Sequence, residues 1–156
     1  MIRRGGLASS AVYPDLCSTQ ENAMPLTEIL AIIGLGLGAA MGLGALLSPE
    51  WASSVVRLKA DTAKGSGYSE FRATYGGLLL MVHAVALVIV FVTPPAGSVL
   101  VVMPIAAGWF GAALGRVVAL LFDRAKLGNT RIIPIWMATE VGLGLAIGAP
   151  VLQFLG

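Results

Sequence analysis

The stretch EFRATYGGLLLMVHAVALVIVFVT, residues 70–93, decides the fold. Its first three residues include Glu70 and Arg72, but no Lys, Arg, Asp or Glu occurs in the rest of the stretch. About 20 apolar residues in a helix cross the ~30 Å hydrocarbon core of a bilayer, and this run has 24 residues. Backbone polar groups in lipid must be hydrogen-bonded within the protein, so the run is predicted to be a transmembrane helix.

Three further apolar runs, 26–47, 98–122 and 132–155, are of similar length. The whole chain is 57% hydrophobic and 12% charged, whereas soluble domains have about 45–50% apolar and about 25% charged residues. The alternation typical of a membrane β-barrel is missing from all four runs. The sequence therefore predicts an all-α, integral membrane bundle of four transmembrane helices, up-down and antiparallel, over residues 26–156.

The first 25 residues have a different character. They show no helical periodicity, and Met24 stands directly before the hydrophobic run. Residues 1–25 are predicted to be a disordered tail, or one created by assigning the start of translation to Met1 instead of Met24. A secretory signal peptide fits poorly, because the first apolar run is long and the basic residues lie far from it.

Basic residues predict the orientation in the membrane. In an up-down bundle the loops 48–69 and 123–131 lie on one side, and they contain Arg57, Lys59, Lys64, Arg124, Lys126 and Arg131. The 93–98 turn on the other side has no charge. Because cytoplasmic loops are enriched in Lys and Arg, these two loops are predicted to be cytoplasmic and both termini to lie outside the inner membrane of a bacterium.

Ionisable residues inside the apolar runs are candidates for a site. Arg116 lies about six residues from the end of the third run, and Glu140 lies eight residues from the start of the fourth. Antiparallel helices joined by a short loop bring these positions to a similar depth, and pairing would relieve the cost of each buried charge. An inward polar cluster is predicted from Glu70, Arg72, Tyr75, Arg116, Asp123 and Glu140. It would either fix the order of the helices by ion pairs or form an anion or substrate pocket or a proton path.

His83, near the middle of the second run, is interpreted either as a packing histidine with satisfied hydrogen bonds or as a proton relay. The sequence alone leaves both open.

Small residues predict where helices pack closely. Residues 34–39 match the dinucleotide-binding pattern G-x-G-x-x-A, but that pattern requires a preceding strand. Glycine rows within one apolar run instead indicate packing between helices. The predicted packing positions are Gly34, Gly38, Gly42, Gly76, Gly77, Gly111, Gly115, Gly144 and Gly148. The row of Gly34, Gly38 and Gly42 is expected to face a protein partner or a second copy of the chain.

The segment EFRATYGG at residues 70–77 resembles the signature E-x-R-A-x-Y-G-G of a family of short bacterial membrane proteins. That family is described only as a domain of unknown function. GAALGR at 111–116 and EVGLG at 140–144 are also similar to its pattern, whereas RAK at 124–126 departs from an expected glycine and proline. The resemblance implies a four-helix membrane bundle with a polar cluster, and it implies no activity.

No catalytic motif or metal-binding spacing occurs in the sequence, and the net charge of +2 is too small to indicate nucleic-acid binding. No cofactor is expected, and the bilayer is the expected environment. The leading hypothesis is a non-enzymatic accessory or assembly component of a membrane complex. The alternative is a small-solute or proton-coupled carrier that uses Arg72, Arg116 and Glu140. An integral-membrane lipid enzyme ranks last.

Overall fold

The computed structural model describes residues 24–61, 67–123, 127 and 131–155. The predicted tail falls mostly on residues 1–23, outside the described part. The elements in chain order are α1 (Leu26–Leu47), α2 (Pro49–Val56), α3 (Gly67–Glu70), the π-helix η1 (Phe71–Leu78), α4 (Leu79–Val92), α5 (Pro95–Phe122), α6 (Ile133–Gly148) and the 3₁₀-helix η2 (Ala149–Phe154). No strand occurs among these described residues.

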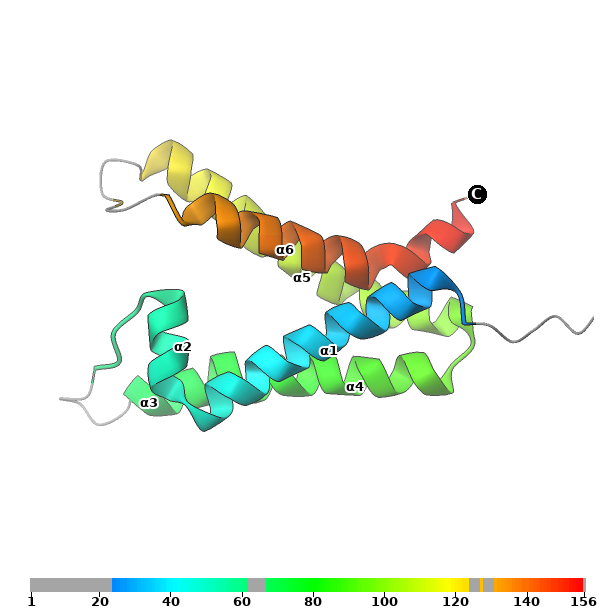
Figure 1. Cartoon of the computed structure of the whole chain (residues 1–156), viewed down its shortest axis with the longest axis horizontal. Helices are drawn as coiled ribbons and strands as arrows, with labels where there is room; N and C mark the ends of the chain where they lie inside the picture. The colour runs from blue at the N-terminus through cyan, green and yellow to red at the C-terminus, as the bar shows by residue number, and fades with distance from the viewer. Residues whose placement is uncertain (1–23, 62–66, 124–126, 128–130, 156) are drawn as a thin grey trace, which may run out of the picture.

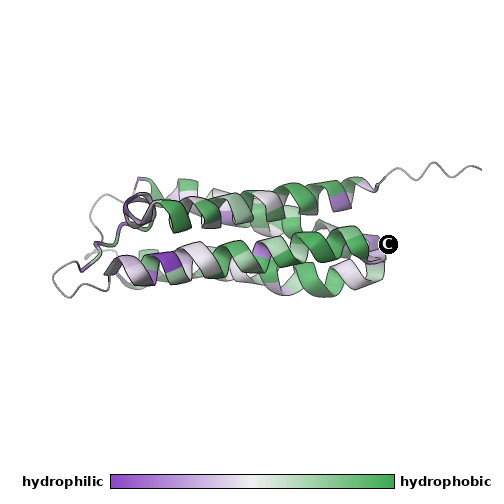
Figure 2. Ribbon diagram, turned by 90° about the horizontal axis from the view of Figure 1, so that it is seen from below, coloured by the Kyte–Doolittle hydropathy of each residue, from purple (hydrophilic) through white to green (hydrophobic). Residues whose placement is uncertain are grey.

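Four helical spans are long and apolar enough to cross a membrane: 26–47, 67–92, 95–122 and 133–154. The prediction of an all-α bundle with four membrane helices is thereby confirmed. The third span begins three residues earlier than predicted, because Pro95 occupies the first turn of α5, where a missing N–H costs nothing. Large aliphatic side chains such as Ile33, Val88 and Leu114 are exposed on the outside. Hydrophobic residues occur along the length of each span (Figure 2). The chain is therefore a multi-pass membrane protein.

The four spans form a closed ring of contacts. Helix α1 packs against α4 and α6, and α5 packs against α6 and α4. Figure 1 shows α5 and α6 as one pair and α1 and α4 as another, and the two pairs cross near the end that carries the C-terminus. A core of buried residues from all four spans lies there: Ala31, Leu35, Ala86, Val90, Val102, Ala106 and Ile147.

A second, smaller core joins α1 to the short segments at the opposite end. It consists of Ala45, Ala52 and Phe71, and Tyr75 packs against it. The predicted loop 48–69 contains the helix α2, which the sequence pattern does not predict. Its start is defined by Ser48, whose Oγ accepts a hydrogen bond from the Trp51 amide at 3.4 Å, and by Pro49 in the first turn.

The π-helix η1 contains most of the EFRATYGG segment and is likewise absent from the sequence-based expectation. A Cβ at Gly76 would lie 2.8 Å from the backbone of Leu46, so this glycine allows η1 to approach the end of α1. The last carbonyls of a helix have no partner inside it, and Arg72 Nη1 donates to the carbonyl oxygen of Leu46 at 2.9 Å. The second span is therefore held against the end of α1 by both residues.

The α1 glycine row corrects the prediction of an outward face. Gly34, Gly38 and Gly42 are buried, and a Cβ added at each would collide with Ile147, the His83 ring and the Leu80 backbone. The other side of α1, at Gly36, has no atom within 4 Å of such a Cβ. The predicted partner face of α1 therefore lies inside the bundle. The sequence does not show which of the two small-residue rows of α1 faces inward, because both have the same spacing.

The Gly42→Ala substitution tests this close packing. Its Cβ would lie 2.3 Å from the Leu80 amide nitrogen, so backbone must move and the free energy of unfolding is expected to fall by about 1–3 kcal/mol. Gly36→Ala is the matched control and should keep or slightly raise stability. The measurement is loss of helical circular dichroism during titration of the detergent-solubilised protein with SDS. Equal midpoints for Gly42→Ala and the wild type would contradict the packing.

Candidate functional site

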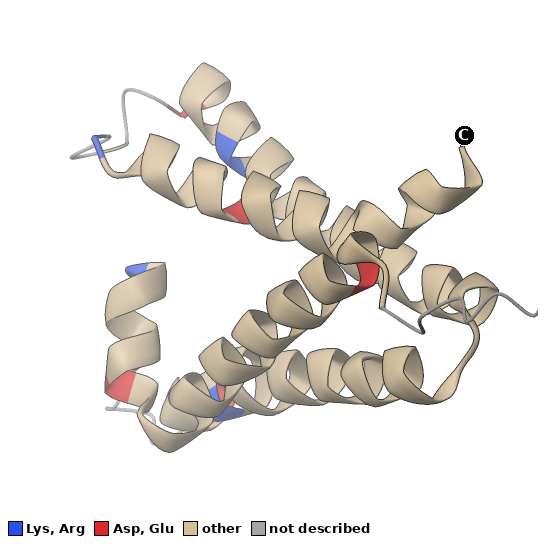
Figure 3. Cartoon of the chain, turned by 45° about the vertical axis from the view of Figure 1, so that its right-hand side comes forward, with Lys and Arg blue, Asp and Glu red and all other residues tan. Residues whose placement is uncertain are grey.

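An ion pair joins α5 to α6 within the membrane-spanning region. Arg116 Nε donates to Glu140 Oε1 at 2.7 Å and to Oε2 at 2.8 Å. The Glu140 side chain is 6% exposed and that of Arg116 is 38% exposed. Figure 3 shows a basic position on α5 beside an acidic position on α6. The structure therefore contains the pair of Arg116 and Glu140, which the sequence predicts from the similar depth of the two residues in the membrane.

The pair constrains how α5 and α6 slide past each other. An ionised carboxylate in a buried, apolar setting is unfavourable unless it is paired and hydrogen-bonded. Both Glu140 oxygens are satisfied by Arg116, and the glycine that follows on the same side of α6, Gly144, lies under the Phe110 ring of α5. The charge pair and this close contact favour the same register.

The remaining members of the predicted cluster are placed elsewhere. Arg72 bonds to α1, and Tyr75 stacks on Phe71 with ring centroids 5.5 Å apart. Glu70 is exposed and lines a shallow hollow with Lys59. Asp123 follows the end of α5, where its amide donates to the Ala119 carbonyl at 2.9 Å. The structure thus divides the predicted set into three parts: the Arg116–Glu140 pair, Asp123 at the end of α5, and the group of Glu70, Arg72 and Tyr75 in or beside η1.

His83 lies at the centre of the contact between three helices. Its ring is 2% exposed and fits against Gly38 of α1. The indole N–H of Trp109 on α5 donates to Nε2 at 3.0 Å, and Nδ1 lies 2.8 Å from the Leu79 carbonyl oxygen. An indole nitrogen can only donate, so the ring is neutral with its proton on Nδ1. Both nitrogens have partners, which favours the packing interpretation of His83 over a proton relay.

Trp109 is a partner of His83 that the sequence does not predict. The two rings also meet edge to face, with centroids 5.8 Å apart. Both residues sit near the middle of antiparallel runs, so their depth is readable from the sequence. Which way each ring points depends on side-chain packing, which the apolar pattern does not encode.

The glycines that are predicted to pack fall into two groups. Those at 76, 144 and 148 have an atom of a neighbouring helix within 3.3 Å of a Cβ placed on them. At Gly77 such a Cβ would approach only the Arg72 carbonyl of the same segment, at 3.6 Å, and at Gly111 and Gly115 nothing lies within 4 Å. The prediction that Gly77, Gly111 and Gly115 pack against a neighbouring helix is therefore wrong, and the two glycines of α5 face outward.

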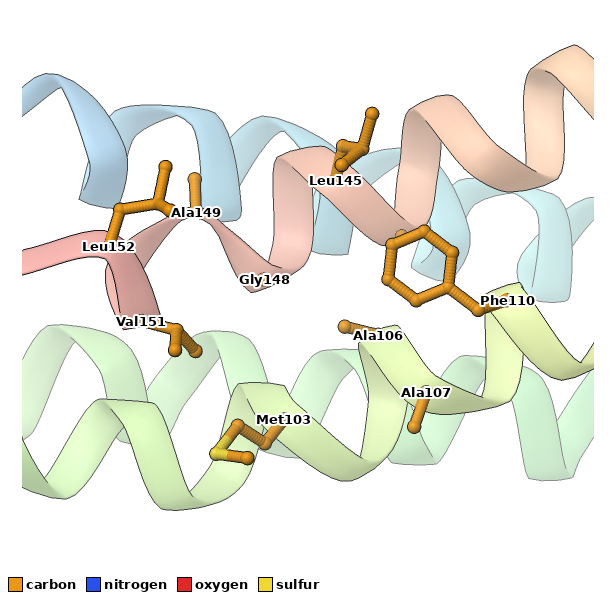
Figure 4. Close-up of a pocket in the computed structure, with 10 residues that line it drawn as sticks. Met103, Ala106, Ala107, Phe110, Leu145, Gly148, Ala149, Val151 and Leu152 are labelled. Carbon is orange, nitrogen blue, oxygen red and sulfur yellow. The ribbon is translucent and has the colours of Figure 1, made fainter. Parts of the chain in front are cut away.

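Several apolar hollows lie beside α5, and two of them involve its contacts with α6 and with η1. One, of about 340 Å³, lies between α5, the end of α6 and η2 (Figure 4). Phe110 reaches across one end of it, and Ala106 faces Gly148. The other, of about 490 Å³, separates α5 from η1 and α4. Among the described residues, no group of three or more His, Cys, Asp or Glu side chains could hold a metal ion.

Comparison of the chain with protein-family profiles, with curated proteins and with solved structures finds no match. The resemblance of EFRATYGG to a family signature therefore stays a prediction.

A double-mutant cycle on His83 and Trp109 tests their hydrogen bond. The single changes are His83→Phe and Trp109→Phe, and the third variant carries both. Hydrogen bonds between membrane helices contribute about 0.6–1.7 kcal/mol, so a coupling free energy in that range is expected from unfolding in SDS. Strictly additive losses would show that the two rings do not interact.

Proposed function

We propose that this protein is a non-enzymatic component of a membrane complex, which binds another membrane protein through the outer face of α5. We place it in the inner membrane of a bacterium, with the loops 48–69 and 123–131 in the cytoplasm. The observation that carries the proposal is the outward face of α5, defined by Ala107, Gly111 and Gly115. These small residues recur every fourth position and are all exposed.

Helix α5 is also the span least covered by the rest of the chain. In its most apolar 18-residue window 11% of the residues are buried, compared with 33% in α1 and in α6. Small residues at every fourth position let a second helix approach closely, and the resulting van der Waals packing favours association of helices in lipid. The row of Gly34, Gly38 and Gly42 on α1 and the pair of Gly144 and Gly148 on α6 are already used inside the bundle.

The polar residues at membrane depth favour this proposal over a carrier. Arg116 and Glu140 bond to each other, and both nitrogens of His83 are occupied. The carrier hypothesis also needs Arg72 in the same cluster, but its bond is to α1. These bonds support a role of the polar groups in positioning the helices.

A leucine placed on the α5 outer face should block the partner. The wild-type chain, purified in mild detergent with a C-terminal tag, is expected to carry a membrane protein in fixed stoichiometry by mass spectrometry of intact complexes. Gly111→Leu should remove that protein, because the added side chain holds the partner helix away. Gly142→Leu is the control, since Gly142 is also exposed and open but lies on α6.

Two results would overturn the proposal. One is a wild-type chain that is isolated as a monomer with no associated protein. The other is an associated protein whose amount is the same with Gly111→Leu as with Gly142→Leu.

A further inference from the structure

The hollow between α5 and the second span is an elongated groove with small residues on one wall. Its volume is about 490 Å³, and its walls include Leu78, Val82, Pro104, Gly108 and Ala112. Nothing lies within 4 Å of a Cβ placed on Gly108, and Ala112 is exposed. The groove therefore exists because α5 presents small side chains where it runs beside η1 and α4.

The two polar rings that line the groove, those of His83 and Trp109, have all their nitrogen atoms in hydrogen bonds. The indole N–H is bonded to Nε2 of His83, and Nδ1 is paired with the Leu79 carbonyl. Only the Thr74 hydroxyl, from η1, adds another polar side chain to the lining. An interior of this kind favours hydrocarbon over a polar solute.

A cationic group lies on α5 one turn beyond the last residue that lines the groove. Arg116 follows Ala112 by four residues and Gly108 by eight, so all three share one side of α5, and Arg116 lies ~12 Å along the axis from Gly108. This is the direction of the predicted cytoplasmic loop 123–131. The Arg116 side chain is 38% exposed while that of Glu140 is 6% exposed. The accessible part of the ion pair is therefore positive.

We propose that this groove binds one acyl chain of an anionic phospholipid, with the headgroup phosphate at the Arg116 guanidinium. The apolar floor accepts the hydrocarbon, and the exposed edge of Arg116 supplies charge complementarity to the phosphate. Arg116 does not itself line the groove, but Glu140 holds it through Nε, which fixes the guanidinium one turn of α5 beyond Ala112. The site does not depend on the proposed protein partner, because Gly111 does not line the groove.

Fluorescence quenching by brominated lipid tests the proposal. The full chain carries Trp51→Phe and Trp136→Phe, so that Trp109 is its sole tryptophan. It is titrated in detergent micelles with phosphatidylglycerol or phosphatidylcholine that has brominated acyl chains. Saturable quenching is expected, with a half-maximal mole fraction about fivefold lower for phosphatidylglycerol, as one Arg at an anionic headgroup would give.

Three variants in the same background separate the parts of the site. Gly108→Leu fills the groove and should abolish the saturable quenching by both lipids. Arg116→Gln with Glu140→Gln removes both charges while two amides can still bond, and it should bring the two lipids to equal mole fractions. Gly111→Leu, one turn away on the outer face of α5, should change neither result.

The proposal is overturned if quenching rises in proportion to mole fraction with one slope for both lipids. It is also overturned if the fluorescence of Gly108→Leu is quenched as in the parent with Trp109 alone. The same holds if the variant with Arg116→Gln and Glu140→Gln keeps the preference for phosphatidylglycerol. Gly111→Leu separates this test from that of the partner, since it should release a protein partner and leave lipid binding unchanged.

Discussion

The ion pair between Arg116 and Glu140 is the interaction on which the arrangement of the second half of the bundle depends. A carboxylate that is 6% exposed among apolar helices requires a partner, because an unpaired charge there is strongly unfavourable. Arg116 is the side chain that meets both of its oxygens. Sliding α5 against α6 by one turn, about 5.4 Å, would break these bonds. The pair therefore selects one register for two helices that otherwise present similar apolar surfaces.

Close backbone contact plays the corresponding part in the first half. Gly42 brings α1 against the Leu80 backbone, and Gly38 makes room for the His83 ring. Lipid tails are as apolar as leucine, so burial alone gives little preference for one helix pairing over another. Shape and hydrogen bonds give that preference instead. His83 connects the two halves, because it lies against α1 and accepts a hydrogen bond from Trp109 of α5.

The four spans and the Arg116–Glu140 pair are predictable from the sequence for the same reason: both follow from length along a helix. Apolar length identifies a span, and residue counts from a loop give depth. The faces of the helices are harder to predict. Because α1 has two small-residue rows, the sequence favours a partner for the row that lies inside, and it places the glycines of α5 in the interior although they are exposed. The π-helix η1 makes tertiary contacts with α1 through Arg72 and Gly76, which the apolar pattern does not contain.

Exchanging the two charges tests the central role of the pair most directly. The variants are Arg116→Glu, Glu140→Arg and the double exchange, each unfolded with SDS in mild detergent. Each single change places two like charges together, and we expect it to lower the free energy of unfolding by about 3–5 kcal/mol, as when a buried pair is broken. The double exchange should regain more than half of the larger loss. A double variant that is no more stable than either single one would contradict a direct pair at this position.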